Sequence, residues 1–444
     1  MKQTAICPPE WLTRSAVYQI NPRTFSKEGT VKAVTNELPK LKSLGFNIMY
    51  LCPIFEEDDS DDKTFWSERQ MQSETENPKN PYRMNNYFKI DSEYGTEDDL
   101  REFISEAHKL GMRVLLDLVY FHIGPNATIL QKHPEFAKSD ADGKVICTRW
   151  NFPYLDFNCD GLREYLWCNM VYYIGEMDVD GFRCDVGDGV PLDFWVEARR
   201  RIRSVKSDAV LINEGSNFNC LLKGFDSIYC FKWHDDLYKA FGGEMTADKL
   251  RESRETLEKT FPKGAKTICD IDNHDTVTDR PMRTEILAGH DGMEQIEVIN
   301  YLVDGIPMVY CGNELADSAN LSMFANRFHM GKFEVTDRRA LEKEEYGIRR
   351  MEVMKKLNAL KLSSDTLLHG KTVWLDNSAP EAVLSFSREY GGEKITFIGN
   401  ISKENITVEF KETIDGEILL TNCAGTVSEN SIKLEPFGYI VIKG

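Results

Sequence analysis

The sequence predicts an α/β fold, a (β/α)8 TIM barrel with a small inserted subdomain after its third strand and a C-terminal antiparallel β-sandwich. Two observations predict this architecture. Short, apolar, β-branched runs alternate with longer helical patterns through most of the chain, and from about residue 371 the pattern becomes alternating strands separated by turn residues. Strand and helix alternating eight times is typical of a parallel barrel, although periodicity alone leaves an open, doubly wound sheet as the competing topology.

Each predicted strand is a short apolar run. The eight candidates are 17–20, 48–51, 114–119, 181–184, 210–212, 227–230, 267–271 and 307–311. Helical patterns cover 31–45, 96–111 and 191–205, and the first two end at glycine, as helices often do. The first and fourth strand-to-strand intervals span about 30 residues, one βα unit each, whereas the second and third are about twice as long.

The two long intervals indicate insertions. The first is an acidic, polar loop over 56–86, whose run 56–63 (EEDDSDDK) we expect to be solvated surface. The second, over 122–160, predicts a small subdomain. We therefore expect a barrel formed by 1–121 and 161–370, an inserted subdomain over 122–160 and a sandwich over 371–444.

Composition restricts the class of protein. No apolar run reaches the roughly 18 residues of a membrane span, and the N-terminal residues lack the apolar region of a signal peptide, so we expect a cytoplasmic protein. The eleven cysteines form no C-x-x-C pair, which favours core thiols in a reducing compartment. The net charge of −18, from 72 acidic against 54 basic residues, argues against nucleic acid and anionic membrane as partners. The sequence leaves the oligomeric state open.

Ionisable residues gather where the predicted strands end. Arg183 and Asp185 lie two apart and hence on one side of a strand, which in isolation a structural ion pair would explain. Other strand ends carry further polar residues: Asp117, His122, Glu214, Asn273, His274 and Asp275. Barrel enzymes collect catalytic groups at the carboxyl ends of their strands, and like charges gathered on one rim repel. The set therefore predicts a catalytic site rather than a stabilising one.

Four of these strand ends carry a family resemblance. DLVYFH (117–122), GFRCD (181–185), NEG (213–215) and DNHD (272–275) resemble, in order, the four motifs of the α-amylase family of retaining glycoside hydrolases. The segments AVYQINPRTF (16–25) and 94–119 also resemble sequences that are typical of the family. The resemblance covers about residues 15 to 315 and extends to the predicted sandwich.

The resemblance implies a role for each matching residue. Asp185 resembles the nucleophile, Glu214 the general acid and base, and Asp275 the carboxylate that grips sugar hydroxyls. Arg183 would orient the nucleophile. The remaining substrate-binding residues implied are Asp117, Tyr82, which falls where the family stacks an aromatic ring on the sugar, and the histidines His122 and His274. No cofactor is implied.

Retaining hydrolysis needs an ionised nucleophile and a protonated acid about 5 to 5.5 Å apart, in unlike environments. Arg183, two residues from Asp185, predicts a lowered pKa for that nucleophile. Glu214 has no basic neighbour in sequence, so nearby anions predict a raised pKa for the acid.

Four positions depart from the family pattern. Phe121 stands where the family commonly has an asparagine calcium ligand, so we expect no bound metal. Asp188 and Gly189 replace a Lys-His pair that reaches leaving-group sugars, and Gly215 follows the acid where some members carry an aromatic residue. These changes predict a wider leaving-group side. Phe65 and Trp66 either stack on sugar or pack under their loop.

The resulting hypothesis is retaining hydrolysis of α-glucosidic bonds in malto-oligosaccharides or related short α-glucosides through a covalent glucosyl-enzyme. A transglycosidase, isomerase or phosphorylase would use the same intermediate and remains an alternative. A non-catalytic carbohydrate-binding barrel is disfavoured because no catalytic carboxylate is missing.

Overall fold

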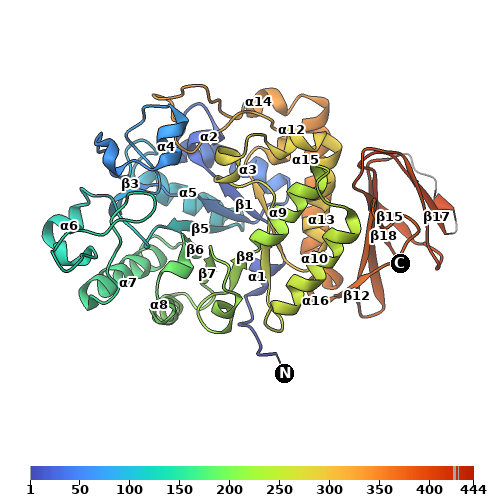
Figure 1. Ribbon diagram of the computed structural model, residues 1–444, viewed down its shortest axis with the longest axis horizontal. Coiled ribbons are helices and arrows are strands. Elements are labelled where there is room, and N and C mark those ends of the chain that lie inside the picture. Colours follow the sequence, from blue (N-terminus) through green and yellow to red (C-terminus); the bar gives the residue numbers. More distant parts are fainter. Residues whose placement is uncertain (1, 424–426, 429) are drawn as a thin grey trace.

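Eight parallel strands close a barrel within residues 2–423, 427–428 and 430–444, which the computed structural model describes (Figure 1). Around the barrel the strands follow the order β1-β10-β9-β8-β7-β6-β5-β2. Their bounds are β1 Val17–Ile20, β2 Ile48–Leu51, β5 Arg113–Leu118, β6 Gly181–Cys184, β7 Val210–Asn213, β8 Ser227–Tyr229, β9 Thr267–Cys269 and β10 Ile306–Tyr310. The predicted barrel is confirmed, and the open-sheet alternative is wrong.

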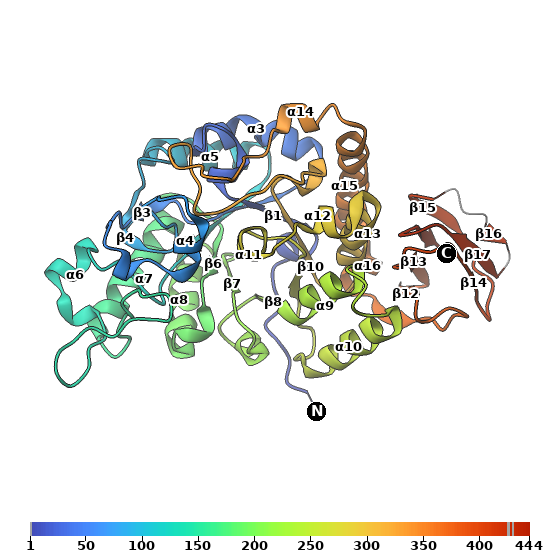
Figure 2. The same ribbon diagram turned by 45° about the horizontal axis from the view of Figure 1, so that its top comes forward.

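Helices surround the barrel, and the longer ones bury apolar side chains in the core that they share with the strands (Figure 2). α5 shows how the sequence sets such a helix: Thr96 and Asp99 form a capping box at its start, and Leu100, Phe103 and Ile104 are buried on its inner face. The longer helices are α3 Val31–Ser43, α5 Glu97–Lys109, α7 Asp160–Gly175, α8 Leu192–Val205, α9 Phe231–Phe241, α10 Ala247–Thr260, α13 Gly289–Leu302 and α15 Glu345–Ser363. The shorter ones are α1 Glu10–Thr13, α2 Pro22–Phe25, α4 Glu68–Ser73, α6 Thr128–Lys132, α11 Thr276–Asp279, α12 Thr284–Leu287, α14 Arg338–Leu341 and α16 Asp365–His369.

The segment after β2 is more structured than the acidic loop that the sequence predicts. β3 Phe55–Glu57 pairs antiparallel with β4 Met84–Ile90, and α4 lies between them. Glu57 and Asp58 are buried, so the expectation that the whole acidic run is solvated is wrong. The reason is a buried cation from another part of the chain, Arg23, whose Nη2 lies 2.9 Å from Glu57 Oε2.

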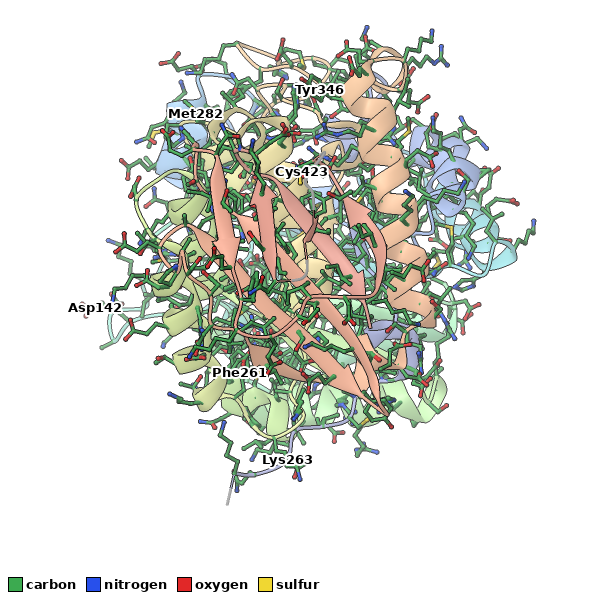
Figure 3. All side chains as sticks on the ribbon, turned by 90° about the vertical axis from the view of Figure 1, so that its right-hand side faces the viewer. Asp142, Phe261, Lys263, Met282, Tyr346 and Cys423 are labelled. Carbon is green, nitrogen blue, oxygen red and sulfur yellow. The ribbon has the colours of Figure 1, made fainter. Side chains whose placement is uncertain are left out.

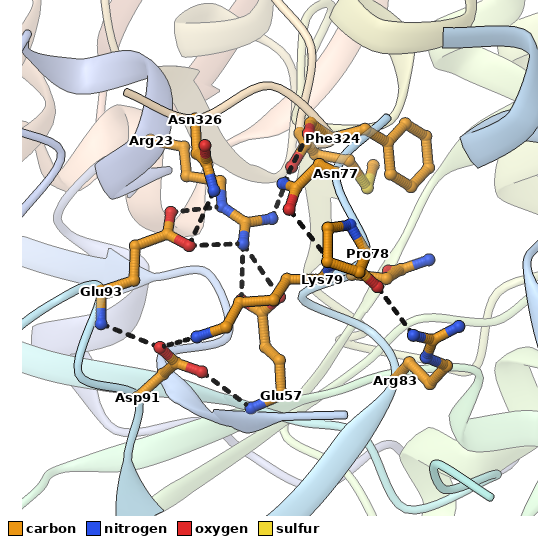
Figure 4. Close-up of polar contacts among 12 residues, drawn as sticks. Arg23, Glu57, Asn77, Pro78, Lys79, Arg83, Asp91, Glu93, Phe324 and Asn326 are labelled. Carbon is orange, nitrogen blue, oxygen red and sulfur yellow. Dashed lines mark hydrogen bonds and ion pairs between the residues drawn. The ribbon is translucent and has the colours of Figure 1, made fainter. Parts of the chain in front are cut away.

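Arg23, on α2, is the centre of a buried polar cluster that ties this segment to the loop after β10 (Figure 4). Its Nε donates to Glu93 Oε1 at 2.8 Å, and its Nη1 donates to the carbonyl oxygen of Met323 at 2.9 Å. Asn77 Nδ2 donates to the carbonyl oxygen of Phe324 at 2.9 Å. These bonds fix Met323 and Phe324, which form one wall of the cavity described below.

The inserted segment 122–160 holds α6, the 3-10 turn Pro134–Phe136 and isolated bridges such as His122 to Tyr154. It lies at the opposite end of the molecule from the C-terminal strands in both ribbon views (Figures 1 and 2). The division of the chain into domains at 121, 160 and 370 stays a prediction. Among the described residues, no helix is long and apolar enough to cross a membrane.

The C-terminal region consists of two antiparallel sheets, of which the five-stranded one lies against the barrel helices (Figure 3). One sheet has the order β11 Lys371–Trp374, β12 Val383–Tyr390, β13 Glu393–Asn400, β18 Tyr439–Lys443 and β15 Glu417–Thr421. The other has the order β14 Ile406–Glu409, β17 Ser431–Leu434 and β16 Val427–Ser428. Apolar residues of both sheets, including Ile398 and Ile432, share one core cluster. Ala424 and Gly425, within the strand pattern predicted from the sequence, lie outside the described residues.

Candidate active site

A small cavity lies where β5, β6, β7 and β9 end. It is lined by five of the predicted site residues, Tyr82, His122, Asp185, Glu214 and Asp275, together with Ser67, Arg69, Asn80, Trp150, Phe152, Val186, Met323 and Phe324. Its volume is about 60 Å³. Since a single water needs roughly 10–15 Å³ on this measure, the cavity has room for only a few waters. The site is therefore narrow, with walls from the barrel and from both inserted segments.

Arg183 organises the carboxylates of the site. The parallel register places Asp117 of β5 beside Arg183 of β6. The buried guanidinium donates from Nη1 to Asp117 Oδ1 at 2.8 Å and to Asp185 Oδ1 at 3.0 Å, and its Nη2 lies 2.9 Å from Glu214 Oε2. One cation thus contacts three carboxylates from three successive strands, which explains why a buried strand carries an ion pair.

The environment of Asp185 differs from the one that its sequence neighbours predict. Burial raises the pKa of Asp185 well above its usual value, the charge of Glu214 raises it further, and Arg183 opposes both effects. The predicted lowering is therefore wrong. Glu214 has no basic neighbour in sequence, but barrel closure brings the same Arg183 to it in space.

Asp275 is held by a cation that the sequence did not reveal. Arg69, on α4, donates from Nη2 to Asp275 Oδ1 at 2.8 Å and from Nε to Asp279 Oδ1 at 2.8 Å. Although burial opposes ionisation, His274 and Arg69 hold the pKa of Asp275 below its usual range. No motif marks Arg69, which lies in the segment that the sequence predicts as a loop.

Tyr82 links the two histidines to the carboxylates. Its hydroxyl lies 2.7 Å from His274 Nε2 and donates to Asp117 Oδ2 at 3.0 Å, and its ring stacks on His274 with centroids 5.2 Å apart. His122 Nε2 lies 2.8 Å from the carbonyl oxygen of Tyr82, to which it donates. Burial lowers the pKa of His122 to about 4, so this ring is neutral at physiological pH. Side-chain and backbone contacts thus connect all eight predicted site residues.

The aromatic side chains at the cavity differ from those singled out in the sequence. Trp150, Phe152 and Phe324 line it. Trp66 is only 3% exposed and its indole N–H donates to the carbonyl oxygen of Ser60, so it packs under its loop. Phe65 is not among the lining residues. Trp150 lies in the inserted segment next to no recognisable motif, and only the structure reveals its position.

The position of the missing calcium ligand does not suit a metal ion. The Phe121 ring packs edge-on against Tyr154 with centroids 5.0 Å apart, and it offers no oxygen. In the described part of the chain, no group of three or more His, Cys, Asp or Glu side chains is arranged to hold a metal.

Comparisons with known proteins show similar sequences and a similar fold. The family model "Alpha amylase, catalytic domain" matches residues 14–143. A cyclomaltodextrinase from Thermoanaerobacter pseudethanolicus is 23% identical over 98% of this chain and 78% of its own length. An intracellular maltogenic amylase from Bacillus subtilis is 24% identical over 86% of this chain and 67% of its own length.

Among solved structures, an α-amylase from Lactobacillus plantarum superposes with a TM-score of 0.80 at 23% identity, covering 98% of this chain and 100% of that one. This likeness shows the shared fold. The residues matched by the family model include the first motif, at the end of β5. The family model and the curated relatives thus show that the chain is similar to the α-amylase family of glycoside hydrolases.

Proposed function

We propose that the protein hydrolyses α-glucosidic bonds in malto-oligosaccharides or related short α-glucosides with retention of configuration. Asp185 acts as the nucleophile, Glu214 as general acid and base, and Asp275 binds sugar hydroxyls. The names of the relatives, cyclomaltodextrinase and maltogenic amylase, support this class of substrate.

One observation carries the assignment of the nucleophile. Arg183 donates a hydrogen bond to Oδ1 of Asp185, whereas Oδ2 of the same carboxylate has no hydrogen-bond partner among the described residues. Asp185 also lines the cavity. A buried carboxylate oxygen without a partner is costly and calls for a functional reason. Attack on an anomeric carbon is such a reason, since Glu214 lines the same cavity and can protonate the leaving oxygen.

The proton inventory of the pair fits the two half-reactions. Burial and the charge of Glu214 raise the pKa of Asp185 well above its usual value, so the site holds a proton above the ordinary carboxylate range. In the reactive form the proton is on Glu214, which delivers it to the leaving group while the ionised Asp185 forms the glycosyl-enzyme. Glu214 then accepts a proton from the attacking water, and the α-anomer is released.

The remaining residues position the sugar. Asp275 is kept ionised by Arg69 and His274 and so accepts hydrogen bonds from sugar hydroxyls. His122 and His274 contact the same ring, and Tyr82 provides the stacking surface with its hydroxyl fixed by Asp117. Arg69 and Phe324 line the same cavity, with the guanidinium over the Phe324 ring.

We also propose a cytoplasmic location and a partner that is an oligosaccharide rather than a nucleic acid or a membrane. The net charge of −18 disfavours anionic partners, and the Bacillus subtilis relative is described as intracellular.

A substrate panel tests the proposal. Maltose to maltoheptaose, sucrose, trehalose, p-nitrophenyl glucoside and starch would be incubated with and without phosphate, and products separated by chromatography. We expect short products and an initial α-anomer by proton NMR. Products longer than the substrate, or a sugar phosphate, would instead identify a transferase or phosphorylase, and an initial β-anomer would contradict the retaining mechanism.

A further inference from the structure

Asp188 accepts hydrogen bonds from residues on both sides of Glu214 in the sequence. Its Oδ1 accepts a hydrogen bond from Asn213 Nδ2 at 2.8 Å. Its Oδ2 accepts the backbone N–H groups of Ser216 at 2.6 Å and Asn217 at 2.9 Å. One carboxylate therefore contacts the residue before Glu214 and the two peptide groups that follow Gly215.

Two glycines are required for this arrangement. A Cβ atom on Gly215 would lie 2.4 Å from Asp188 Oδ1, and one on Gly187 would lie 2.1 Å from Asn213 Oδ1. Neither glycine has a left-handed backbone, so close approach rather than conformation excludes a side chain. The absence of an aromatic residue after Glu214, a departure noted in the sequence, is thus the condition for the Asp188 contact.

The segment carrying Asp188 also holds Glu214 directly. The Val186 N–H donates to Glu214 Oε2 at 2.8 Å, and the Gly187 N–H donates to the Glu214 carbonyl oxygen at 3.0 Å. Val186 has a φ of 42°, a left-handed conformation that is strained for a β-branched residue. Strain of this kind persists where surrounding contacts enforce it, and it occurs often at active sites.

Core packing does not hold the loop after Glu214. Ser216, Asn217 and Asp188 are all exposed, and exposed loops with few buried contacts open most easily. The loop is therefore held in position by hydrogen bonds rather than by packing, and Asp188 accepts three of them.

We propose that Asp188 is a positioning residue for Glu214, holding the segment 213–217 so that the acid keeps its contacts with the Val186 N–H and Arg183. The inference rests on the proposed role of Glu214 as general acid. It assigns Asp188 a purpose different from the one expected from the sequence, where it was only a lost substrate contact.

Asp188→Asn tests the inference. The amide has the same shape but one acceptor oxygen, so an NH2 group must face either Asn213 Nδ2 or the two backbone N–H groups. kcat/KM would be measured on maltotriose and on α-glucosyl fluoride, whose fluoride leaves without protonation. Since kcat/KM reports the steps up to the glycosyl-enzyme, we expect about a 10- to 100-fold loss on maltotriose and less than about threefold on the fluoride.

Asp140→Asn is the matched control. Asp140 is exposed and accepts the backbone N–H groups of Asp142 and Lys144 at 3.0 and 2.9 Å, but it does not line the cavity. This variant should be unchanged on both substrates. A second variant, Gly215→Ala, retains the Asp188 side chain but pushes it away from the loop, and it should show the same selective loss.

Glu214→Gln distinguishes a failure of the proposed function from a failure of the positioning role of Asp188. A wild-type protein that cleaves neither substrate would refute the proposed function. If Glu214→Gln spares only the fluoride whereas Asp188→Asn and Gly215→Ala slow both substrates equally, or neither, the positioning role is wrong although the function stands.

Discussion

Replacing Gly189 by alanine tests whether two departures from the family pattern form a single packed contact. The Phe121 ring occupies the space beside Gly189, where a Cβ atom would lie 2.4 Å from Phe121 Cε2 and 2.5 Å from Cδ2. Favourable carbon–carbon separations are about 3.5–4.0 Å, so the ring would have to move by about 1 Å.

The expected magnitude follows from two opposing effects. Overpacking of this kind costs about 1–3 kcal/mol. Alanine for glycine restricts the unfolded chain, which stabilises by about 0.4–1 kcal/mol where the conformation is allowed, and Gly189 is not left-handed. Because Phe121 is only half-buried and can yield in part, we expect a net loss of about 1 kcal/mol in the free energy of unfolding.

Urea unfolding of Gly189→Ala, Phe121→Ala and the double variant measures the coupling. We expect the double variant to be more stable than the sum of the single changes by about 1 kcal/mol. Gly175→Ala is the control, since its Cβ atom would meet only Val205 at 3.5 Å and should not destabilise. A stabilising Gly189→Ala, or strictly additive changes, would refute the contact.

Four further outcomes are expected. Asp185→Asn should abolish turnover, with a loss of several orders of magnitude in kcat, because no other group can form the covalent intermediate; near-normal cleavage of maltotriose would refute the assignment. Arg69→Met should lower kcat/KM about tenfold, because it removes one partly screened, charge-assisted hydrogen bond to Asp275. An unchanged kcat/KM would show that His274 alone is enough to keep Asp275 in its functional state. Burial raises the pKa of Glu57 from 4.5 to about 7. Its protonated form therefore contributes stability that is complete below about pH 4.5 and lost as the pH rises to about 7. In urea unfolding from pH 5 to 8, the free energy of unfolding of Glu57→Gln should decline less than that of the wild type, and parallel curves would contradict this. Prolonged dialysis against EDTA should leave the melting temperature and the rate nearly unchanged, whereas a loss restored by calcium would reveal a metal site.

The barrel was predictable because its strands are buried on both faces. Such strands appear as short apolar runs, and each of the eight lies within two residues of its predicted bounds. The clustering of Asp117, Arg183, Asp185 and Glu214 was predictable for a related reason. Parallel strands in register present their carboxyl ends on one rim, so residues at strand ends meet whatever their separation in sequence.

The electrostatics of the site were not predictable from sequence neighbours. Arg183 is two residues from Asp185, which suggested an exclusive pair, but barrel closure also brings Glu214 and Asp117 to the same guanidinium. Burial then outweighs a cation shared among three anions. Arg69 and Trp150 were missed because they lie in inserted segments, where loops without periodicity give no indication of which side chains turn inward.

The departures from the family pattern are best explained together. Treated singly, Phe121, Asp188, Gly189 and Gly215 are four losses: of a metal ligand, of two substrate contacts and of an aromatic neighbour. In the structure each depends on another, since the Phe121 ring requires Gly189 and the Asp188 carboxylate requires Gly215. Restoring one family residue alone would place a side chain where another side chain already packs. The two contacts adjoin the segment 186–188 that holds Glu214, so the positioning role proposed for Asp188 draws on all four departures.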